Sequence, residues 1–121
     1  MESKKIAIIG GGAAGFFAAL SVKEHHPYHE VVLFEKTSKV LSKVKVSGGG
    51  RCNVTHDCSD IATLCEAYPR GSKKLKSLFY QFNTTDTITW FESRGVAIKA
   101  EKDGRMFPVS DQSQSIIDCL V

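Results

Sequence analysis

The first third of the chain consists of two continuous apolar runs separated by a glycine-rich turn and a helical pattern. The run Lys5–Ile9 predicts a buried strand. A helix is predicted from Ala13 to about Glu24, and its small residues would let it lie close to a sheet. The run Glu30–Phe34 predicts a second strand that is buried on both faces. The connection is too long for a hairpin, so we expect parallel strands joined by a right-handed crossover.

The rest of the chain predicts helices and one hairpin. Between Thr37 and Asp60 we expect mostly loop. Three helices are then predicted: one from a cap at Ser59/Asp60 to Tyr68, one over Ser72–Phe82, and one from a cap at Thr85/Asp86 to Arg94. A hairpin of Val96–Lys99 and Arg105–Phe107 is expected next, followed by a last helix capped by Ser110.

The turn between the first strand and the helix has the pattern G-x-G-x-x-G. Gly10 would let the strand turn sharply, Gly12 would let a pyrophosphate approach the backbone, and Gly15 would let the helix pack on the strand. Glu35 follows the second strand, about 20 residues after Gly15, where an acid can accept hydrogen bonds from ribose hydroxyls. Strand, turn, helix, strand and acid in this order predict a dinucleotide site. The acid would repel a 2′-phosphate, which favours FAD or NAD over NADP.

A second glycine cluster lies about a dozen residues after Glu35. Gly48–Gly50 stands next to Arg51 and Asn53, and such a loop can pass close to a second planar or phosphate-bearing part of a ligand. A dehydrogenase domain would more often continue directly into another helix and strand. The cluster therefore favours FAD over NAD, and a flexible glycine loop is the alternative.

Composition limits the class of protein. The chain has 121 residues, which predicts one domain over residues 1–121. Its net charge of +3 is too small to argue for a nucleic acid partner. No apolar run approaches the ~18 residues that a membrane helix needs. The four cysteines lack zinc spacing and no secretory signal precedes them, so we expect free thiols and a cytoplasmic protein.

The end of the chain bears on completeness. The segment Ile116–Val121 stops inside an apparent amphipathic helix, without a glycine or charged stop signal. Only two parallel-sheet strands are recognisable, whereas a doubly wound sheet normally has more. We expect an N-terminal fragment of a longer enzyme. A small protein with a frayed end is the competing interpretation.

Two further segments carry a family resemblance. Lys43-Val-Lys-Val-Ser-Gly-Gly-Gly-Arg-Cys-Asn-Val-Thr55 resembles the pattern G-x-K-x-x-x-S-G-G-G-R-C-N-x-T-N of the BaiN/YhiN-like NAD(P)/FAD-dependent oxidoreductases, also called HI0933-type or aminoacetone oxidase family. This chain departs from the pattern at Leu41, where the family usually has Gly, and at His56, where it usually has Asn. Asp103–Asp111 is similar to the family's G-R-x-F-P-x-S-D segment. With the first glycine turn, the resemblance spans essentially the whole chain.

The resemblance implies an α/β protein: a partial, glutathione-reductase-like Rossmann domain for FAD, with a small β-hairpin and helical insertions. It implies an FAD-dependent oxidoreductase with NAD(P)H as electron donor and a small-molecule substrate. The first glycine turn would meet the pyrophosphate and Glu35 the ribose, and the later loop would run towards the flavin. The expected cofactor-binding residues are Gly10, Gly12, Ala13, Ala14, Gly15, Glu35, Lys36, Lys43, Ser47, Gly48, Gly49, Gly50, Arg51, Cys52 and Asn53. No catalytic acid or base is predicted within the chain, and no metal site.

Two alternative functions stay open. One is a flavoprotein that acts on RNA, and the other is a non-catalytic dinucleotide-binding module. The basic run in the second predicted helix is most simply the solvated side of an amphipathic helix, although an RNA contact is the other interpretation. The run consists of Arg70, Lys73, Lys74 and Lys76.

Three side-chain groups invite sharper hypotheses. Cys52 and Cys58 are separated by five residues rather than the four of flavin disulfide reductases, so we do not expect a catalytic disulfide. The histidines at the end of the first helix, His25, His26 and His29, are expected to form a solvated turn. Arg105 is expected either to reach the flavin or substrate or to brace its loop by pairing with Asp111.

Overall fold

The predicted βαβ unit is present at the start of the chain. The computed structural model describes residues 2–121 and contains strand β1 (Lys5–Ile9), helix α1 (Ala13–His25) and strand β2 (Glu30–Phe34). The strands pair in parallel, with Lys5 opposite Glu30 and Ile9 opposite Phe34. Both strands have the predicted bounds, and α1 ends one residue later than expected.

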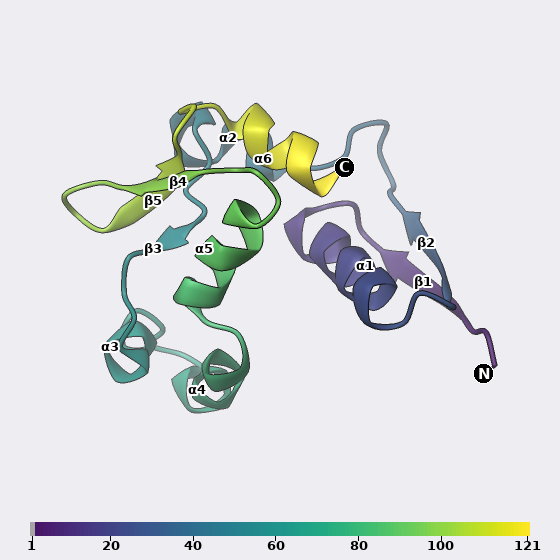
Figure 1. The fold of residues 1–121 in the computed structure, drawn as a ribbon, viewed down its shortest axis with the longest axis horizontal. Coiled ribbons are helices and arrows are strands. Elements are labelled where there is room, and N and C mark those ends of the chain that lie inside the picture. Colours follow the sequence, from purple (N-terminus) through teal and green to yellow (C-terminus); the bar gives the residue numbers. More distant parts are fainter. Residues whose placement is uncertain (1) are drawn as a thin grey trace.

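Helix α1 covers one face of the β1–β2 sheet, the face towards the rest of the molecule (Figure 1). On the other face, Ile9 is 82% and Phe34 54% exposed, and Val32 is exposed as well. The molecule has an accessible surface of 8261 Å², whereas a compact monomer of 13.3 kDa would expose roughly 6,500 Å². The expected burial of β2 on both faces is wrong, because its alternate residues Val32 and Phe34 lie on the face that α1 leaves uncovered.

The segment after β2 is more ordered than the sequence predicts. Thr37–Asp60 is mostly loop, as predicted, but it also contains helix α2 (Ser42–Val46), a 3-10 turn η1 (Ser47–Gly50) and strand β3 (Thr55–His56). These elements are too short to produce a recognisable hydrophobic period. Tertiary contacts determine them: Leu41, just before α2, donates its N–H to the Gly11 carbonyl at 2.7 Å and is 1% exposed.

The remaining elements form a helical layer and a small antiparallel sheet. They are α3 (Ile61–Glu66), α4 (Ser72–Gln81), α5 (Thr84–Glu92), β4 (Ile98–Ala100), β5 (Arg105–Pro108) and α6 (Ser113–Leu120). The predicted hairpin is β4–β5, and β3 joins its other side, so that the strand order is β3-β5-β4. The hairpin prediction is confirmed, and the third strand is an addition.

Two of the predicted helix caps are wrong. Asp60 caps α3 as expected, accepting the Thr63 N–H at 3.0 Å. Helix α5 is capped by Asn83 and not by Thr85 or Asp86. Asp86 accepts the Asn83 N–H at its Oδ2, which completes a capping box. Ser110 does not cap α6, because its hydroxyl pairs with that of Ser115.

The main core joins α1 to the later helices. Its buried members are Leu41, Val44, Cys52, Phe91, Ile116 and Leu120, contributed by the α2 region, α5 and α6. Phe16 and Leu20 of α1 pack against this cluster, and Arg94, just after α5, forms an ion pair with Glu24 near the end of α1. The βαβ unit is thus held against the segment that contains the second glycine cluster.

Candidate functional site

The first glycine turn adopts the geometry that the sequence predicts. Gly10 has φ +106° and donates its N–H to the Phe34 carbonyl at 2.7 Å. A Cβ added at Gly15 would lie 2.0 Å from the Gly10 carbonyl oxygen, so only glycine lets the helix start this close to the strand. A Cβ at Gly12 would meet no heavy atom within 4 Å. Close packing explains Gly15, whereas the space around Gly12 is open to a ligand.

The N-terminus of α1 is prepared for an anion. Gly12 is its N-cap, no side chain caps it, and its first turn contains no acid. The first N–H groups of a helix have no intrahelical partner and carry about half a positive charge. Gly12, Ala13 and Ala14 are all exposed. A phosphate group fits this end of the helix without displacing any side chain.

Glu35 already accepts hydrogen bonds from the protein. Its Oε1 accepts the Gly11 N–H at 2.9 Å, and its Oε2 accepts the backbone N–H and the hydroxyl of Thr37 at 2.7 and 2.9 Å. The bonds from Thr37 and then Gly11 lower the pKa of the Glu35 carboxyl. Since a carboxylate offers about four acceptor positions, Oε1 keeps room for one further donor. Ribose could therefore gain one unshared hydrogen bond here rather than the two that an empty carboxylate offers.

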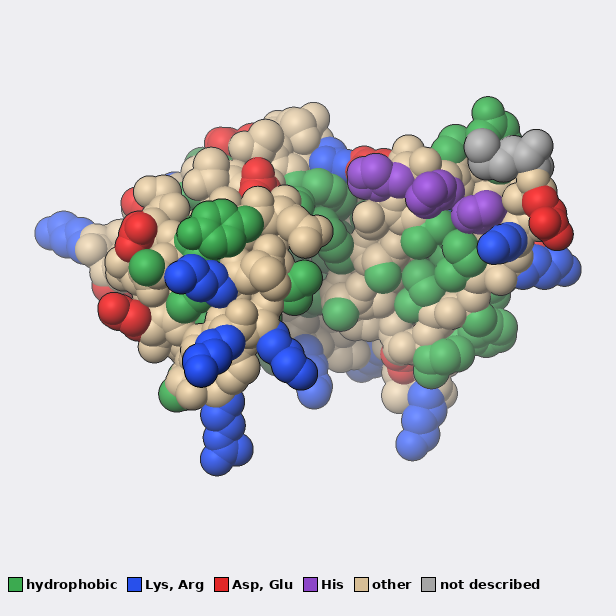
Figure 2. Space-filling view, turned by 90° about the horizontal axis from the view of Figure 1, so that it is seen from below, with side chains coloured by type: hydrophobic (Ala, Val, Ile, Leu, Met, Phe, Trp, Pro, Cys, Tyr) green, Lys and Arg blue, Asp and Glu red, His purple; other side chains and the backbone are tan. Residues whose placement is uncertain are grey.

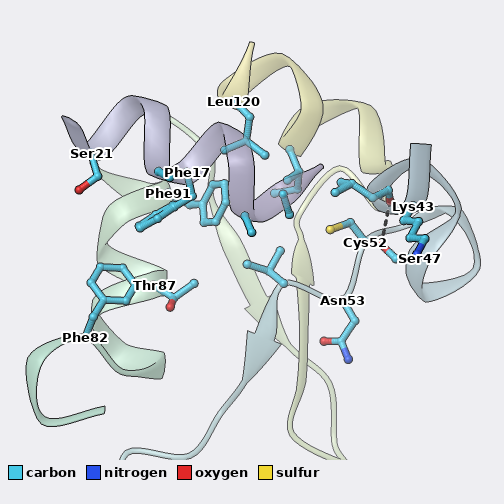
Figure 3. Close-up of a pocket in the computed structure, with 16 residues that line it drawn as sticks. Phe17, Ser21, Lys43, Ser47, Cys52, Asn53, Phe82, Thr87, Phe91 and Leu120 are labelled. Carbon is cyan, nitrogen blue, oxygen red and sulfur yellow. Dashed lines mark hydrogen bonds between the residues drawn. The ribbon is translucent and has the colours of Figure 1, made fainter. Parts of the chain in front are cut away.

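A cavity of about 790 Å³ lies beside the glycine turn, within the range of roughly 300–1,000 Å³ for small-molecule sites. Figure 3 shows Lys43, Ser47 and Cys52 grouped at one end and Ser21 and Phe82 at the other. The lining is mostly apolar and comprises Ala13, Ala14, Phe17, Ala18, Ser21, Lys43, Val44, Ser47, Cys52, Asn53, Val54, Phe82, Thr87, Phe91, Ile116 and Leu120.

Six of the predicted cofactor-binding residues line this cavity. They are Ala13, Ala14, Lys43, Ser47, Cys52 and Asn53, from two segments far apart in the sequence. The other nine lie around it or away from it: Gly10, Gly12 and Gly15 form the turn before α1, Glu35 and Lys36 follow β2, and Gly48, Gly49, Gly50 and Arg51 form the loop between Ser47 and Cys52.

The second glycine cluster needs its glycines for backbone reasons. Gly48, Gly49 and Gly50 have φ of +57°, +67° and +92°, a region that favours glycine. A Cβ at Gly48 would also lie 2.9 Å from the Phe107 ring. Cys52 follows with φ +63° and is 7% exposed, and this burial raises the pKa of its thiol. The buried thiol is packed at the cavity wall rather than activated as a nucleophile.

Arg51 and Arg105, the arginines of the two later motifs, both form ion pairs. Arg51 lies between Glu101 and Asp111, with Nη1 at 2.7 and 3.2 Å from their carboxylate oxygens. Arg105 pairs with Asp103, at 2.7 Å from Nε to Oδ2. The predicted brace between Arg105 and Asp111 is therefore wrong. Arg105 bonds a carboxylate two residues away in its own turn, while the fold brings Arg51 and Lys99 to Asp111.

Sequence reasoning missed the aromatic wall of the cavity. Phe17 contacts both Phe82 and Trp90, with ring centroids 5.3 and 5.1 Å apart, and Phe91 lies against Trp90. The adjacent residues Phe16 and Phe17 in α1 could have indicated this wall. Neighbouring residues of a helix point in different directions, so two adjacent aromatic side chains cannot both face the same core. Phe16 packs against the core, and Phe17 faces the cavity. A smaller cavity of about 390 Å³ adjoins it and shares Asn53, Val54, Phe82 and Thr87.

The parallel βαβ unit, its glycine turn and its acid define a Rossmann-type nucleotide-binding domain. Residues 4–121 match the protein family described as HI0933-like protein Rossmann domain, and the chain belongs to this family. The resemblance drawn from its motifs is confirmed.

Relatives of known activity share similarity along nearly the whole chain. A 3-dehydro-bile acid delta(4,6)-reductase of Clostridium scindens is 30% identical over 116 residues, which cover 96% of this chain and 27% of that protein. A ribosomal RNA dihydrouridine synthase of Escherichia coli is 31% identical over 121 residues, or 100% of this chain and 29% of that protein. The synthase of the same name from Haemophilus influenzae is 27% identical over 113 residues, which cover 93% of this chain and 27% of that protein. The chain spans less than a third of the length of these relatives.

Other kinds of site find little support in the described residues. Within residues 2–121, no three His, Cys, Asp or Glu side chains are grouped as metal ligands. At the histidine turn, the His26 and His29 rings stack with centroids 5.5 Å apart, and His25 bonds the Ser21 carbonyl. None of the helices over these residues has the length and apolar character that crossing a bilayer requires. All four cysteines are free.

Proposed function

We propose that this chain binds FAD and serves as the N-terminal part of an FAD-dependent oxidoreductase that takes its electrons from NAD(P)H. One observation carries the proposal. The start of α1 and the segment from Lys43 to Asn53 border the same cavity, although about 30 residues separate them. FAD has a phosphate-bearing half and a flavin half, and two separate ligand-facing segments suit such an elongated cofactor.

The phosphate half suits the first glycine turn. The exposed N–H groups at the start of α1 would bind the pyrophosphate, and the open space at Gly12 admits it. The remaining acceptor position on Glu35 Oε1 would bind a ribose hydroxyl. Lys36, which is exposed beside Glu35, would add positive charge near the same end.

The flavin half suits the cavity. Phe17, Phe91 and Leu120 offer an apolar lining for a ring system, and Lys43 lies at the end where Ser47 and Cys52 also meet (Figure 3). Bound FAD supplies hydride transfer, while the protein positions and shields it. We assign no catalytic acid or base to these residues. The apolar cavity and the similarity to a protein named as a reductase support the reduction of a small-molecule substrate.

Completion of the enzyme is part of the same proposal. The relatives are more than three times as long as this chain, and the outer face of the β1–β2 sheet exposes Ile9, Val32 and Phe34. We propose that a C-terminal part of the same polypeptide covers this face and supplies the substrate pocket, and that the protein works in the cytoplasm.

The absorption spectrum of the purified full-length protein tests the proposal. A flavin spectrum, or its appearance on reconstitution with FAD, is expected, followed by bleaching with NADH or NADPH under anaerobic conditions. A colourless protein that does not take up FAD would overturn the assignment. Bound FAD that neither nicotinamide reduces would support a non-catalytic binding module instead.

A second candidate function is modification of RNA. Figure 2 shows Lys and Arg side chains gathered over the region of α4. Arg70, Lys73, Lys74 and Lys76 are exposed and form no ion pair among residues 2–121. An unpaired basic face attracts a polyanion, and two relatives are named as ribosomal RNA dihydrouridine synthases.

A mobility-shift titration with ribosomal RNA at several salt concentrations tests this candidate. Replacing Lys73 and Lys76 by Ala should weaken binding and reduce its salt dependence. Replacing the exposed Lys4 and Lys102, which lie away from α4, is the matched control and should change binding less. Equal effects of the two sets would contradict a specific role for α4.

A further inference from the structure

Arg51 connects the second glycine cluster to the β4–β5 hairpin. Its guanidinium carbon lies 3.7 Å from the centroid of the Phe107 ring, and Phe107 is fully buried. Its Nη1 lies 2.7 Å from Glu101 Oε1 and 3.2 Å from Asp111 Oδ1. Arg51 is therefore held by a stacking contact and two carboxylates at once.

The backbone of the same loop packs on the hairpin as well. The Val54 N–H donates to the Met106 carbonyl at 2.8 Å. Gly48 lies so close to Phe107 that a Cβ would come within 2.9 Å of the ring. Within the loop, the Cys52 N–H donates to the Ser47 carbonyl at 2.9 Å. Ser47 and Cys52, at the two ends of the loop, both line the large cavity.

The charge of Arg51 is balanced where it stands. Asp111 also accepts a bond from Lys99, with 2.6 Å between Nζ and Oδ2. Two cations and two carboxylates thus form one cluster with no excess charge. The bond to Glu101, ahead of the opposing effect of burial, raises the pKa of Arg51. A phosphate that approached Arg51 would therefore compete with two existing ion pairs at Nη1.

The geometry points to Arg51 as a positioning residue: through Phe107, Glu101 and Asp111 it holds the loop from Ser47 to Asn53 in the shape that forms one end of the cavity, instead of contacting the cofactor itself. The inference rests on the proposed FAD site. It departs from the expectation that Arg51 touches FAD.

The two roles predict opposite effects of removing the carboxylates. If Arg51 contacted the pyrophosphate, the double variant Glu101→Gln/Asp111→Asn would free its charge, and FAD would bind equally well or more tightly. If Arg51 positions the loop, the same variant loosens the loop, and FAD affinity falls by about tenfold, the equivalent of one charged hydrogen bond. Arg51→Lys should also weaken binding, because lysine keeps the charge but loses the planar stacking and the fork.

The experiment compares these variants in the full-length protein by FAD titration and by hydrogen–deuterium exchange without FAD. Faster exchange over residues 47–53 is expected in both variants, together with weaker FAD binding. Asp103→Asn is the matched control, because it removes the ion pair of Arg105 in the same hairpin without touching Arg51. It should leave both measurements unchanged. Thermal unfolding establishes that each variant is folded at the temperature used.

Unchanged or tighter FAD binding by the double variant, or unchanged exchange of the loop, would overturn the positioning role. Failure of the proposed function is a separate result. A wild-type protein that binds no FAD contradicts the cofactor assignment, while the exchange measurement still reports whether Arg51 orders the loop.

Discussion

The amide of Gly11 donates a hydrogen bond to Oε1 of Glu35, with 2.9 Å between the two atoms. The bond joins the glycine turn after β1 to the acid after β2. A Cβ on Gly11 would lie 3.1 Å from the Cβ of Glu35, so the two backbones also approach closely. The adenosine end of the predicted site is thus organised by the protein itself before any ligand binds.

Gly12→Val should abolish FAD binding and leave the fold intact. The new side chain meets no protein atom near its Cβ, but it fills the space through which a pyrophosphate would approach the helix. The expected cost to stability is about 1 kcal/mol, because valine is a poor N-cap. FAD content and circular dichroism of the purified variant check this prediction. A variant that retains its FAD would contradict the assignment of the turn.

Gly15→Ala should have the opposite profile and destabilise the protein. Its Cβ would lie 2.0 Å from the Gly10 carbonyl oxygen, so strand and helix must move apart, at a cost of about 1–3 kcal/mol. Urea unfolding measures the loss, with Gly95→Ala as a partial control, since its φ of +86° is strained but no atom stands near its Cβ. Wild-type stability for Gly15→Ala would show that the close approach is not needed.

Glu35→Gln should weaken the fold in a pH-dependent way. The Thr37 and Gly11 bonds lower the pKa of Glu35 in the folded state below its usual value of 4.5. Its contribution is therefore complete above that value and is lost as the pH falls through the folded pKa. Thermal unfolding should separate wild type from variant more at about pH 7 than at about pH 3.

The control for Glu35 is Glu66→Gln, which changes an exposed acid on α3. Its effect should be small at both pH values. A difference between wild type and Glu35→Gln that grows towards low pH would contradict the hydrogen-bonded carboxylate. In the holoprotein, the same variant should also lower FAD affinity through the weakened ribose contact.

Leu41→Gly should destabilise the protein although it relieves backbone strain. Leu41 has φ +56°, where a non-glycine residue costs about 1–2 kcal/mol. Its side chain is 1% exposed in the main core, and deleting a buried leucine costs about 2–5 kcal/mol. The packing loss is larger, so urea unfolding should show a net loss of about 1–3 kcal/mol. The exposed Leu78→Ala is the control, and a gain in stability would show that strain dominates.

Cys52 should resist alkylation in the folded protein. Burial raises the pKa of its thiol and hides it from the reagent, and the thiolate is the reactive form. Iodoacetamide labelling followed by mass spectrometry should modify the half-buried Cys58 and Cys65 first. All four cysteines should react alike in denaturant. Labelling of Cys52 as fast as Cys58 in the native state would contradict its buried position.

The sequence predicted the elements that are determined by neighbouring residues along the chain. Both strands of the βαβ unit were predicted with their observed bounds, because long apolar runs and a glycine turn are strong local signals. The segment from Thr37 to Asp60 is mostly loop, as predicted, but its short elements were not predicted. Helix α2 and strand β3 are short, and both depend on partners distant in sequence, Gly11 for Leu41 and Met106 for Thr55.

The sequence alone determined the class of fold, the likeness to one family and the residues expected to meet a cofactor, since glycines at set spacing and an acid after a strand have specific backbone and charge requirements. Only the tertiary structure decided which of those residues share a cavity and which of them form ion pairs with other parts of the chain. It placed Lys43 and Asn53 beside the start of α1, and it paired Arg51 with Glu101 and Asp111. The reason is physical: side-chain pairing across 50 or 60 residues depends on how the hairpin packs against the loop, and no local pattern encodes that contact.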